Sequence, residues 1–143
     1  MIVLDTNVLS EPLKPAPDAG MMKWLAAQSP ATLFITTITV AEMLVGIEKM
    51  PAGRKRKALA EALDLRLFPL FAGRTLGFDF LCARAFATVV ASANAAGNDI
   101  DFADASIAAI AIANEYVLAT RNVRDFRGTG VRLLNPWTQE PDP

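Results

Sequence analysis

With 143 residues, a hydrophobic fraction of 52% and a formal net charge of −1, the chain fits a single well-packed domain whose overall field does not attract nucleic acid. It contains no histidine, which excludes Ser-His-Asp and Cys-His catalysis, histidine acid–base chemistry and His-ligated zinc sites. The remaining candidates for chemistry are carboxylates, lysine, hydroxyls and a hard metal ion.

Two features bear on the compartment of the protein. Cys82 is the only cysteine, so no intramolecular disulfide is expected and a reducing compartment is indicated. Its apolar neighbours predict a packed thiol. The longest strongly apolar run, Ala105 to Ala113, is about half of the roughly 20 residues that a membrane span requires. No basic region precedes an apolar segment at the N-terminus, so we expect no secretory signal and a cytoplasmic protein.

The first expected strand, Ile2 to Leu4, runs into the polar residues Asp5, Thr6 and Asn7. Open parallel sheets bind their ligands in the crevice beyond the carboxyl ends of the strands, so Asp5 would stand where such folds hold their chemistry. The alternative is that Asp5 and Asn7 only form an Asx turn. This stretch alone favours neither interpretation.

Short strands alternate with helices along the rest of the chain. Apolar periodicity and the positions of proline and glycine predict helices over 8–13, 18–28, 39–50, 54–68, 79–96 and 100–115, and further strands over 33–37, 74–78, 117–120 and 131–134. Gly97 is expected to cap the C-terminus of the helix before it. The alternation predicts a single α/β domain over 1–143, with a parallel sheet covered on both faces and a polar tail at 136–143.

The helix expected from residue 54 begins with the basic run Arg54 to Lys57. Positive charge in a first turn opposes the helix dipole, so local stability does not explain the run. Two interpretations stay open, a solvated basic face and a patch for a polyanion.

Acids and amides also stand where helices begin or strands end. Glu42 follows Thr39 at the spacing of a capping box, and Asp101 is a natural helix N-cap with Asp104 in the first turn. Asn122 and Asp125 follow the strand over 117–120. Each has a structural interpretation as a cap or turn residue.

Asp104 is the least well explained by capping, because the helix after it is apolar nearly all round and therefore buried. If Asp5 and Asp104 faced each other at about 4 Å, their repulsion would be on the order of 4 kcal/mol at an effective dielectric of 20. A hard divalent ion bound between the two carboxylates would replace this repulsion with attraction. Oxygen ligands without histidine favour Mg²⁺ or Mn²⁺ over zinc.

Four motifs in a fixed order give the chain a family resemblance. They are Leu4-Asp5-Thr6-Asn7, Thr39-Val-Ala-Glu42, Asp104-Ala-Ser-Ile-Ala-Ala, and the segment from Ala119 to Phe126 that contains Asn122. Together they resemble a PIN-domain ribonuclease, and most closely the VapC type of toxin from toxin–antitoxin pairs, including the FitB-like branch with its Asn135-Pro-Trp137 ending. The resemblance covers essentially the full length.

The resemblance implies a PIN-like α/β/α sandwich with a short central parallel sheet, acting as a Mg²⁺- or Mn²⁺-dependent endoribonuclease on single-stranded RNA. By position, Asp5 and Asp104 would be the direct metal ligands, and Glu42 would support the metal or orient its water. The fourth family position falls on Asn122, where many relatives carry aspartate. Whether Asp101 or Asp125 compensates stays open.

The resemblance also implies partners, namely a second copy of the chain and a small DNA-binding antitoxin. Apolar helical positions such as Met43, Leu44 and Ile47 could form the groove for the antitoxin, or could be ordinary core. Thr6, Asn7 and Thr120 are candidates for hydrogen bonds around the site, as Arg121 and Arg124 are for phosphate contact.

Two other functions compete with the nuclease. A strand ending in aspartate also opens phosphatases of the haloacid dehalogenase type, but their second aspartate would fall on Asn7. An inactive PIN-like binding module is the non-enzymatic alternative, and Asn122 is the residue that favours it.

Overall fold

The computed structural model describes residues 1–138 and 140–141. Its centre is a six-stranded sheet in the order β3-β2-β1-β4-β5-β6. The strands are β1 (Ile2–Leu4), β2 (Leu33–Thr36), β3 (Thr75–Leu76), β4 (Val117–Ala119), β5 (Leu133–Asn135) and β6 (Glu140–Pro141). The first five are parallel, with β1 in the middle, and β6 pairs antiparallel with β5. The predicted α/β class with a parallel sheet is confirmed.

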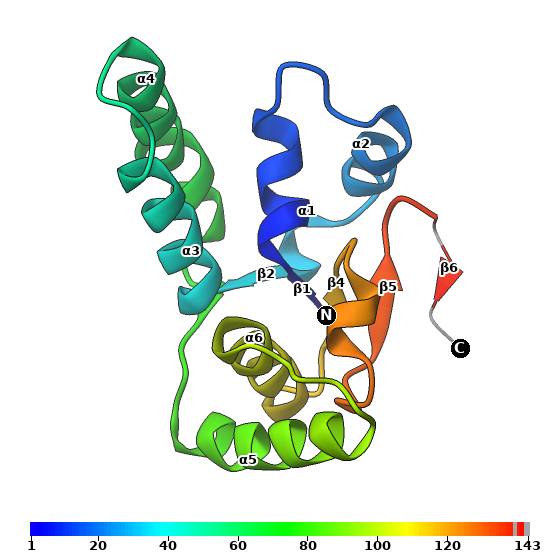
Figure 1. Cartoon of the computed structure of the whole chain (residues 1–143). Helices are drawn as coiled ribbons and strands as arrows, with labels where there is room; N and C mark the ends of the chain where they lie inside the picture. Colours follow the sequence, from blue (N-terminus) through cyan, green and yellow to red (C-terminus); the bar gives the residue numbers. More distant parts are fainter. Residues whose placement is uncertain (139, 142–143) are drawn as a thin grey trace.

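Helices cover the sheet on both sides (Figure 1). One side carries α1 (Thr6–Ser10), α2 (Ala19–Ala26), α3 (Thr37–Glu48) and α4 (Arg54–Ala62), and the other carries α5 (Phe80–Ala95) and α6 (Phe102–Ala113). Short turns of 3₁₀ or π helix join them: η1 (Glu11–Leu13), η2 (Pro30–Thr32), η3 (Leu63–Leu67), η4 (Phe68–Phe71) and η5 (Val123–Phe126). The result is a three-layer α/β/α sandwich from which the α3–α4 hairpin projects (Figure 1).

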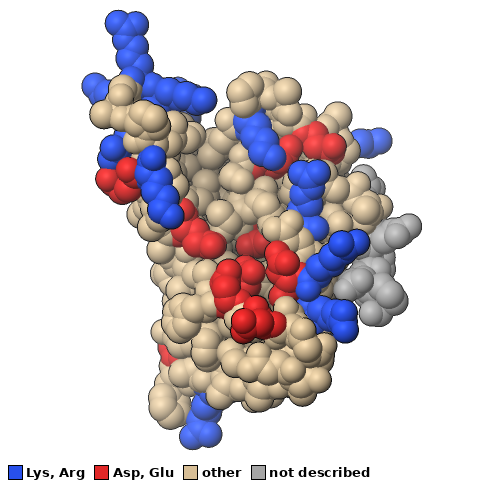
Figure 2. All heavy atoms as spheres, in the orientation of Figure 1, with Lys and Arg blue, Asp and Glu red and all other residues tan. Residues whose placement is uncertain are grey.

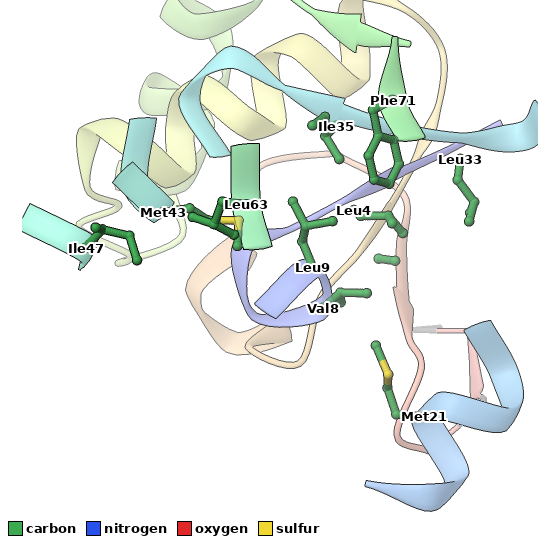
Figure 3. Packing of buried hydrophobic residues seen from close by; sticks show 11 residues of the cluster. Leu4, Val8, Leu9, Met21, Leu33, Ile35, Met43, Ile47, Leu63 and Phe71 are labelled. Carbon is green, nitrogen blue, oxygen red and sulfur yellow. The ribbon is translucent and has the colours of Figure 1, made fainter. Parts of the chain in front are cut away.

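The alternation of side chains along β1 explains why both faces are covered. Leu4 packs with Val8 and Met43 on the side of α1 and α3 (Figure 3). Its neighbour Val3 packs with Ile107 of α6 on the other side. Because successive side chains of a strand point to opposite faces, a strand buried on both faces must be apolar throughout. The first polar residue after β1 therefore stands at the edge where the core ends.

Two helices begin earlier than predicted. The helix expected over 8–13 begins at Thr6, directly after Asp5, and continues as η1. The helix expected from Thr39 begins at Thr37, and its N-cap is Thr36, whose hydroxyl accepts the N–H of Thr39. The capping-box expectation for Thr39 and Glu42 is therefore wrong. Glu42 lies in the second turn of α3, whereas the glutamate of a capping box lies in the first turn.

The other boundaries agree more closely with the prediction. The helix expected over 54–68 is α4 followed by the π turn η3. Asp101 caps α6 by accepting the N–H of Asp104 at 2.9 Å, as predicted. Gly97 follows α5 with a φ of 76°, the left-handed conformation of a C-terminal glycine. Cys82 is 1% exposed, which confirms a packed thiol.

The C-terminal segment is more regular than the polar tail predicted at 136–143. A turn over 136–138 leads into β6, which extends the sheet beyond β5. Gln139, Asp142 and Pro143 of that predicted tail lie outside the described residues. Across the part of the chain that the structure describes, no helix is long and apolar enough to cross a bilayer.

Candidate active site at the carboxyl ends of the strands

The parallel register of β1 and β4 builds the centre of the site. Leu4 pairs with Ala119, so the next residue of each strand, Asp5 and Thr120, lies at the same level of the sheet. The backbone N–H of Asp5 donates to Ala119 O at 3.0 Å, and that of Thr120 donates to Leu134 O of β5. The ladder thus holds an acid and a hydroxyl side by side, although they are 115 residues apart.

Asp5 is buried, with 4% of its surface exposed, and is surrounded by donors. Its carboxylate accepts the backbone N–H of Thr6 at 2.7 Å, the amide of Asn7 at 2.7 Å and the hydroxyl of Thr120 at 2.7 Å. Burial raises the pKa of Asp5 above its ordinary value, the three hydrogen bonds lower it in part, and the charge of Asp125 raises it further. The geometry thus combines helix capping with a fixed carboxylate facing the crevice.

Glu42 reaches the same crevice from α3. The hydroxyl of Thr6 donates to Glu42 Oε2, which ties the first turn of α1 to the second turn of α3. Burial raises the pKa of Glu42, the bond from Thr6 lowers it, and the nearby charges of Asp5 and Asp101 raise it again. Glu42 is therefore positioned beside Asp5.

Asp104 enters from the first turn of α6. Its pKa is raised to about 7, first by burial and then by the charges of Asp101, Asp5, Asp125 and Glu42. Each of these acids therefore lies within electrostatic reach of Asp104. The structure brings together the three acids that the sequence singled out, from β1, α3 and α6.

Asn122 differs from these acids in its surroundings. It is exposed and stands as the N-cap of η5, with its backbone N–H donating to Thr120 Oγ1 at 3.0 Å. Asp125, three residues on, is also exposed, but its charge raises the pKa of both Asp5 and Asp104. Asp125 thus contributes negative charge on the side of the crevice where Asn122 contributes none.

The acids form one patch in the middle of a face of the molecule (Figure 2). The ion pairs among the described residues are Lys14–Glu11 and Arg56–Glu48, so neither neutralises this patch. In residues 1–138 and 140–141, no three Asp, Glu or Cys side chains converge tightly enough to enclose a cation as they stand. The donors nevertheless suit a hard divalent ion, because they are partly buried carboxylates that raise one another's pKa and take part in neither of the two ion pairs formed by the described residues.

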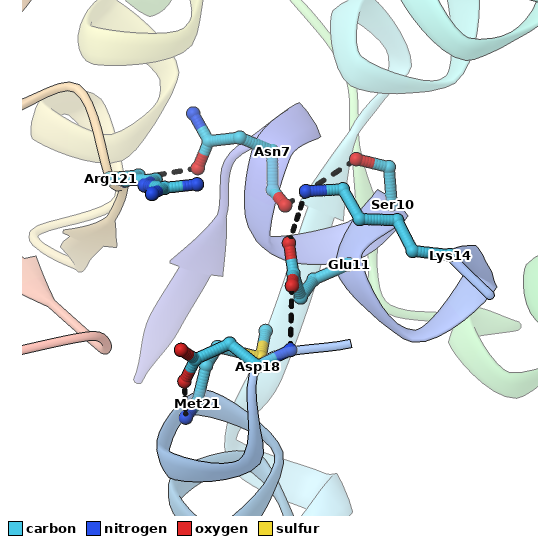
Figure 4. Close-up of polar contacts among 7 residues, drawn as sticks. All are labelled: Asn7, Ser10, Glu11, Lys14, Asp18, Met21 and Arg121. Carbon is cyan, nitrogen blue, oxygen red and sulfur yellow. Dashed lines mark hydrogen bonds and ion pairs between the residues drawn. The ribbon is translucent and has the colours of Figure 1, made fainter. Parts of the chain in front are cut away.

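One buried acid was not identified from the sequence. Glu11, 3% exposed, accepts Lys14 Nζ at 2.5 Å and the backbone N–H of Asp18 at 2.8 Å, and these bonds lower its pKa. Figure 4 shows this network beside Asn7, whose Oδ1 accepts the N–H of Arg121 at 3.0 Å. Glu11 secures the link from α1 to α2. Its spacing to Lys14 was the only local signal.

The fold and the crevice together define an α/β protein with a carboxylate-rich candidate active site at the carboxyl ends of its parallel strands. Comparisons with known proteins agree with this class. The PIN domain model matches residues 2–131. The chain belongs to the PIN-domain family.

Its relatives match it over nearly their full length. The plasmid stability protein StbB of Pseudomonas syringae pv. tomato is 47% identical, with 96% of this chain and 99% of StbB covered. The VapC ribonuclease Y4jK of Sinorhizobium fredii is 42% identical, with 96% and 98% covered. The toxin FitB of Neisseria gonorrhoeae is 39% identical, with 96% and 99% covered. The solved structure of FitAcB from that organism matches with a TM-score of 0.91, 39% identity and coverage of 96% and 99%.

Proposed function

We propose that this protein is a metal-dependent endoribonuclease that hydrolyses single-stranded RNA and acts as the toxin of a toxin–antitoxin pair. The observation that carries the proposal is that Asp5, Glu42 and Asp104 lie within electrostatic reach of one another in one acidic patch (Figure 2), with no paired cation among the described residues. The names of the relatives, among them a VapC ribonuclease and a toxin, support the same function.

The acids divide the work by position. Asp5 and Asp104 would hold Mg²⁺ or Mn²⁺ directly, and Glu42 would support the ion or orient its water. When bound, such an ion lowers the pKa of a water and offsets charge on the scissile phosphate. In the metal-free protein the pKa of Asp104 is raised to about 7, and a bound divalent ion would favour its ionised form.

The neutral residues around the acids position them. Thr120 and Asn7 each donate to Asp5 Oδ2, and Thr6 donates to both Asp5 and Glu42 through its N–H and its hydroxyl. These bonds keep the carboxylates oriented toward the crevice. They also favour the ionised form of the two carboxylates, which is the form that a cation requires.

Arg121 and Arg124 are the cations that we assign to the RNA phosphates beside the scissile bond. Both are exposed on the loop that follows β4 and line a surface hollow of about 320 Å³ with Asn122 and Asp125. The guanidinium of Arg121 lies 5.3 Å from the centre of the Trp137 ring, which limits its freedom without neutralising its charge.

We propose an antitoxin segment as the occupant of the groove beside the acids. The groove, of about 420 Å³, has Thr6 and Glu42 at its acidic end and Met43, Ile47 and Met50 along its floor. Met43 and Ile47 are buried core residues that also line the groove, whereas Leu44 is exposed and does not line it. A segment bound there would block the approach of RNA to Glu42.

A second copy of the chain is the other proposed partner. Phe80 and Leu81 in the first turn of α5 are 72% and 63% exposed, and Phe102, the first residue of α6, is 71% exposed, so these helices present large apolar side chains that a second copy could cover. Replacing both Phe80 and Leu81 with serine is expected to convert a dimer to a monomer in light scattering, with the circular dichroism spectrum unchanged. A variant that stays dimeric would exclude this surface.

The proposed activity is tested by incubating the chain, free of any antitoxin, with matched single-stranded RNA, single-stranded DNA and double-stranded RNA. Cleavage of the single-stranded RNA alone, with Mg²⁺ and not with excess EDTA, is the expected result. Unchanged RNA in every condition would favour the inactive binding module instead. A trapped phosphoenzyme would favour the phosphatase alternative.

A further inference from the structure

Basic residues are concentrated at the tip of the α3–α4 hairpin. Five of the 14 basic residues of the chain, Lys49, Arg54, Lys55, Arg56 and Lys57, fall within nine positions that contain no acid. The net charge of the chain is −1. The tip is therefore a local positive surface on a molecule that is otherwise slightly acidic, and we call these five residues the basic tip.

The basic tip is not explained by contacts within the fold. Arg56 forms an ion pair with Glu48 at 2.5 Å, but within the part of the chain that the structure describes no ion pair is made by Lys49, Arg54, Lys55 or Lys57. Four of the five stand in the first turn of α4, where positive charge opposes the helix dipole and destabilises the helix by a few tenths of a kcal/mol per residue. Apart from Arg56, the charges of the basic tip therefore cost stability locally and gain none from an ion pair among the described residues.

The basic tip lies on the same face of the molecule as the acidic patch. The hairpin projects beyond the body (Figure 1), and basic side chains at its end are visible in the view that shows the acids (Figure 2). Lys49 follows Glu42 by seven residues along α3, which is about 10 Å at about 1.5 Å per residue. The groove that starts at Glu42 continues to Met50 and Leu59 at the base of the tip.

We infer that the basic tip binds the phosphate backbone of the RNA substrate, at nucleotides beyond those held at the acidic patch. This inference rests on the proposed function and adds a second contact to it. A single strand laid across this face would meet Arg121 and Arg124 on one side of the acids and the basic tip on the other. An RNA strand whose scissile phosphate lies at the acids carries further phosphates along its length, and cationic side chains in line with the acids can bind them.

The test uses two variants that remove the same charge from different surfaces. The tip variant is Arg54→Gln with Lys55→Gln, and the matched control is Lys23→Gln with Arg84→Gln, which are exposed on α2 and α5. Arg56 is left intact because it pairs with Glu48. Since the tip variant relieves the dipole conflict, its melting temperature is expected to equal or exceed that of the wild type, so a loss of binding cannot come from unfolding.

Affinity is measured in EDTA with fluorescent RNA of about 16 nucleotides and of about four nucleotides. The tip variant is expected to bind the long strand about tenfold more weakly, and the slope of log K against log salt is expected to fall by about 0.7 for each lost phosphate contact. The short strand and the control variant are expected to behave as the wild type does.

The possible outcomes distinguish an error in the role of the basic tip from an error in the proposed ribonuclease function. If the wild type cleaves RNA but the tip variant binds long RNA as the control does, the inference is wrong and the proposed function stands. If the tip variant instead loses affinity only for duplex DNA, the basic tip belongs to a DNA contact and the inference is also wrong. If the wild type neither binds RNA in EDTA nor cleaves it in Mg²⁺, both the inference and the proposed function fail.

Discussion

The hydroxyl of Thr120 donates to Oδ2 of Asp5 at 2.7 Å across the β1–β4 ladder, and neither side chain is more than 4% exposed. Thr120 also accepts the backbone N–H of Asn122 at 3.0 Å. One hydroxyl thus connects the central acid to the loop that carries the fourth family position.

Thr120→Val, which keeps the shape and removes the hydroxyl, is expected to lower kcat about tenfold, since a hydrogen bond to a buried charged group is lost. The bond from Thr120 lowers the pKa of Asp5, so the acidic limb of the pH–rate profile should move to higher pH. Thr120→Ser, the control, should keep both kcat and the profile. Equal kcat in all three proteins would show that the bond does not position Asp5.

The pKa of Asp104 predicts how stability depends on pH in the metal-free protein. The carboxyl binds its proton up to about pH 7 in the folded state, against an ordinary value of 3.8. Between these values the folded state holds more protons than the unfolded state, so stability falls as pH rises. In EDTA, the melting temperature should therefore fall as the pH rises from about 4 to about 7.

The variant Asp104→Asn should flatten that dependence and melt higher than the wild type at the alkaline end. Mg²⁺ should raise the melting temperature of the wild type there and leave the variant unchanged. Asp99→Asn, an exposed acid outside the patch, is the control. A variant with the same slope as the wild type would contradict the role of Asp104.

The charges on the loop after β4 are expected to change the affinity of the site for Mn²⁺. Asn122→Asp adds a fourth carboxylate and should tighten Mn²⁺ binding about tenfold, whereas Asp125→Asn should weaken it by a similar factor. The reason is that the charge of Asp125 already reaches Asp5 and Asp104. Calorimetric titration with Mn²⁺ measures both. Wild-type affinity in both variants would place this loop outside the metal site.

Gly128 anchors the same loop against α5. A Cβ at Gly128 would lie 2.5 Å from Ala96 Cβ and 3.3 Å from Ser92 O, whereas a Cβ at Gly130 would meet nothing within 4 Å. Both glycines have a φ of 79°, so Gly130→Ala measures the backbone strain alone, about 1 kcal/mol. Gly128→Ala should cost about 1–3 kcal/mol more, because overpacking adds to the strain. Equal destabilisation in urea unfolding would show that the loop yields freely.

The sequence predicted those parts of the fold that local pattern determines. Each expected strand was found within two residues, although β3 and β5 contain no fully buried residue. For β1, β2 and β4, a short run of mostly apolar residues that is largely buried favours a strand of a covered parallel sheet. The N-cap role of Asp101 and the C-terminal cap at Gly97 could also be predicted, because each residue acts on the helix end next to it in the sequence.

The predictions that were wrong or missing concern contacts between segments that are distant in the sequence. Thr36 and Thr39 are equally good caps by residue type, and only the end of β2 decides that α3 begins at Thr37. The bond between Asp5 and Thr120 follows from β1 pairing with β4, and the burial of Glu11 follows from the packing of α2. No spacing along the chain reveals these pairings, so the sequence named the acids of the site but not the hydroxyls and amides that orient them.

We propose that Asp5, with Glu42 and Asp104, holds the divalent ion on which RNA cleavage by this protein depends. It is tested most directly by the rate at which wild type and Asp5→Asn cleave one single-stranded RNA as Mg²⁺ is titrated, with folding of both checked by circular dichroism. We expect a saturable Mg²⁺-dependent rate for the wild type and no detectable cleavage by a folded Asp5→Asn at any Mg²⁺ concentration. Wild-type rates in Asp5→Asn, or in excess EDTA, would contradict it.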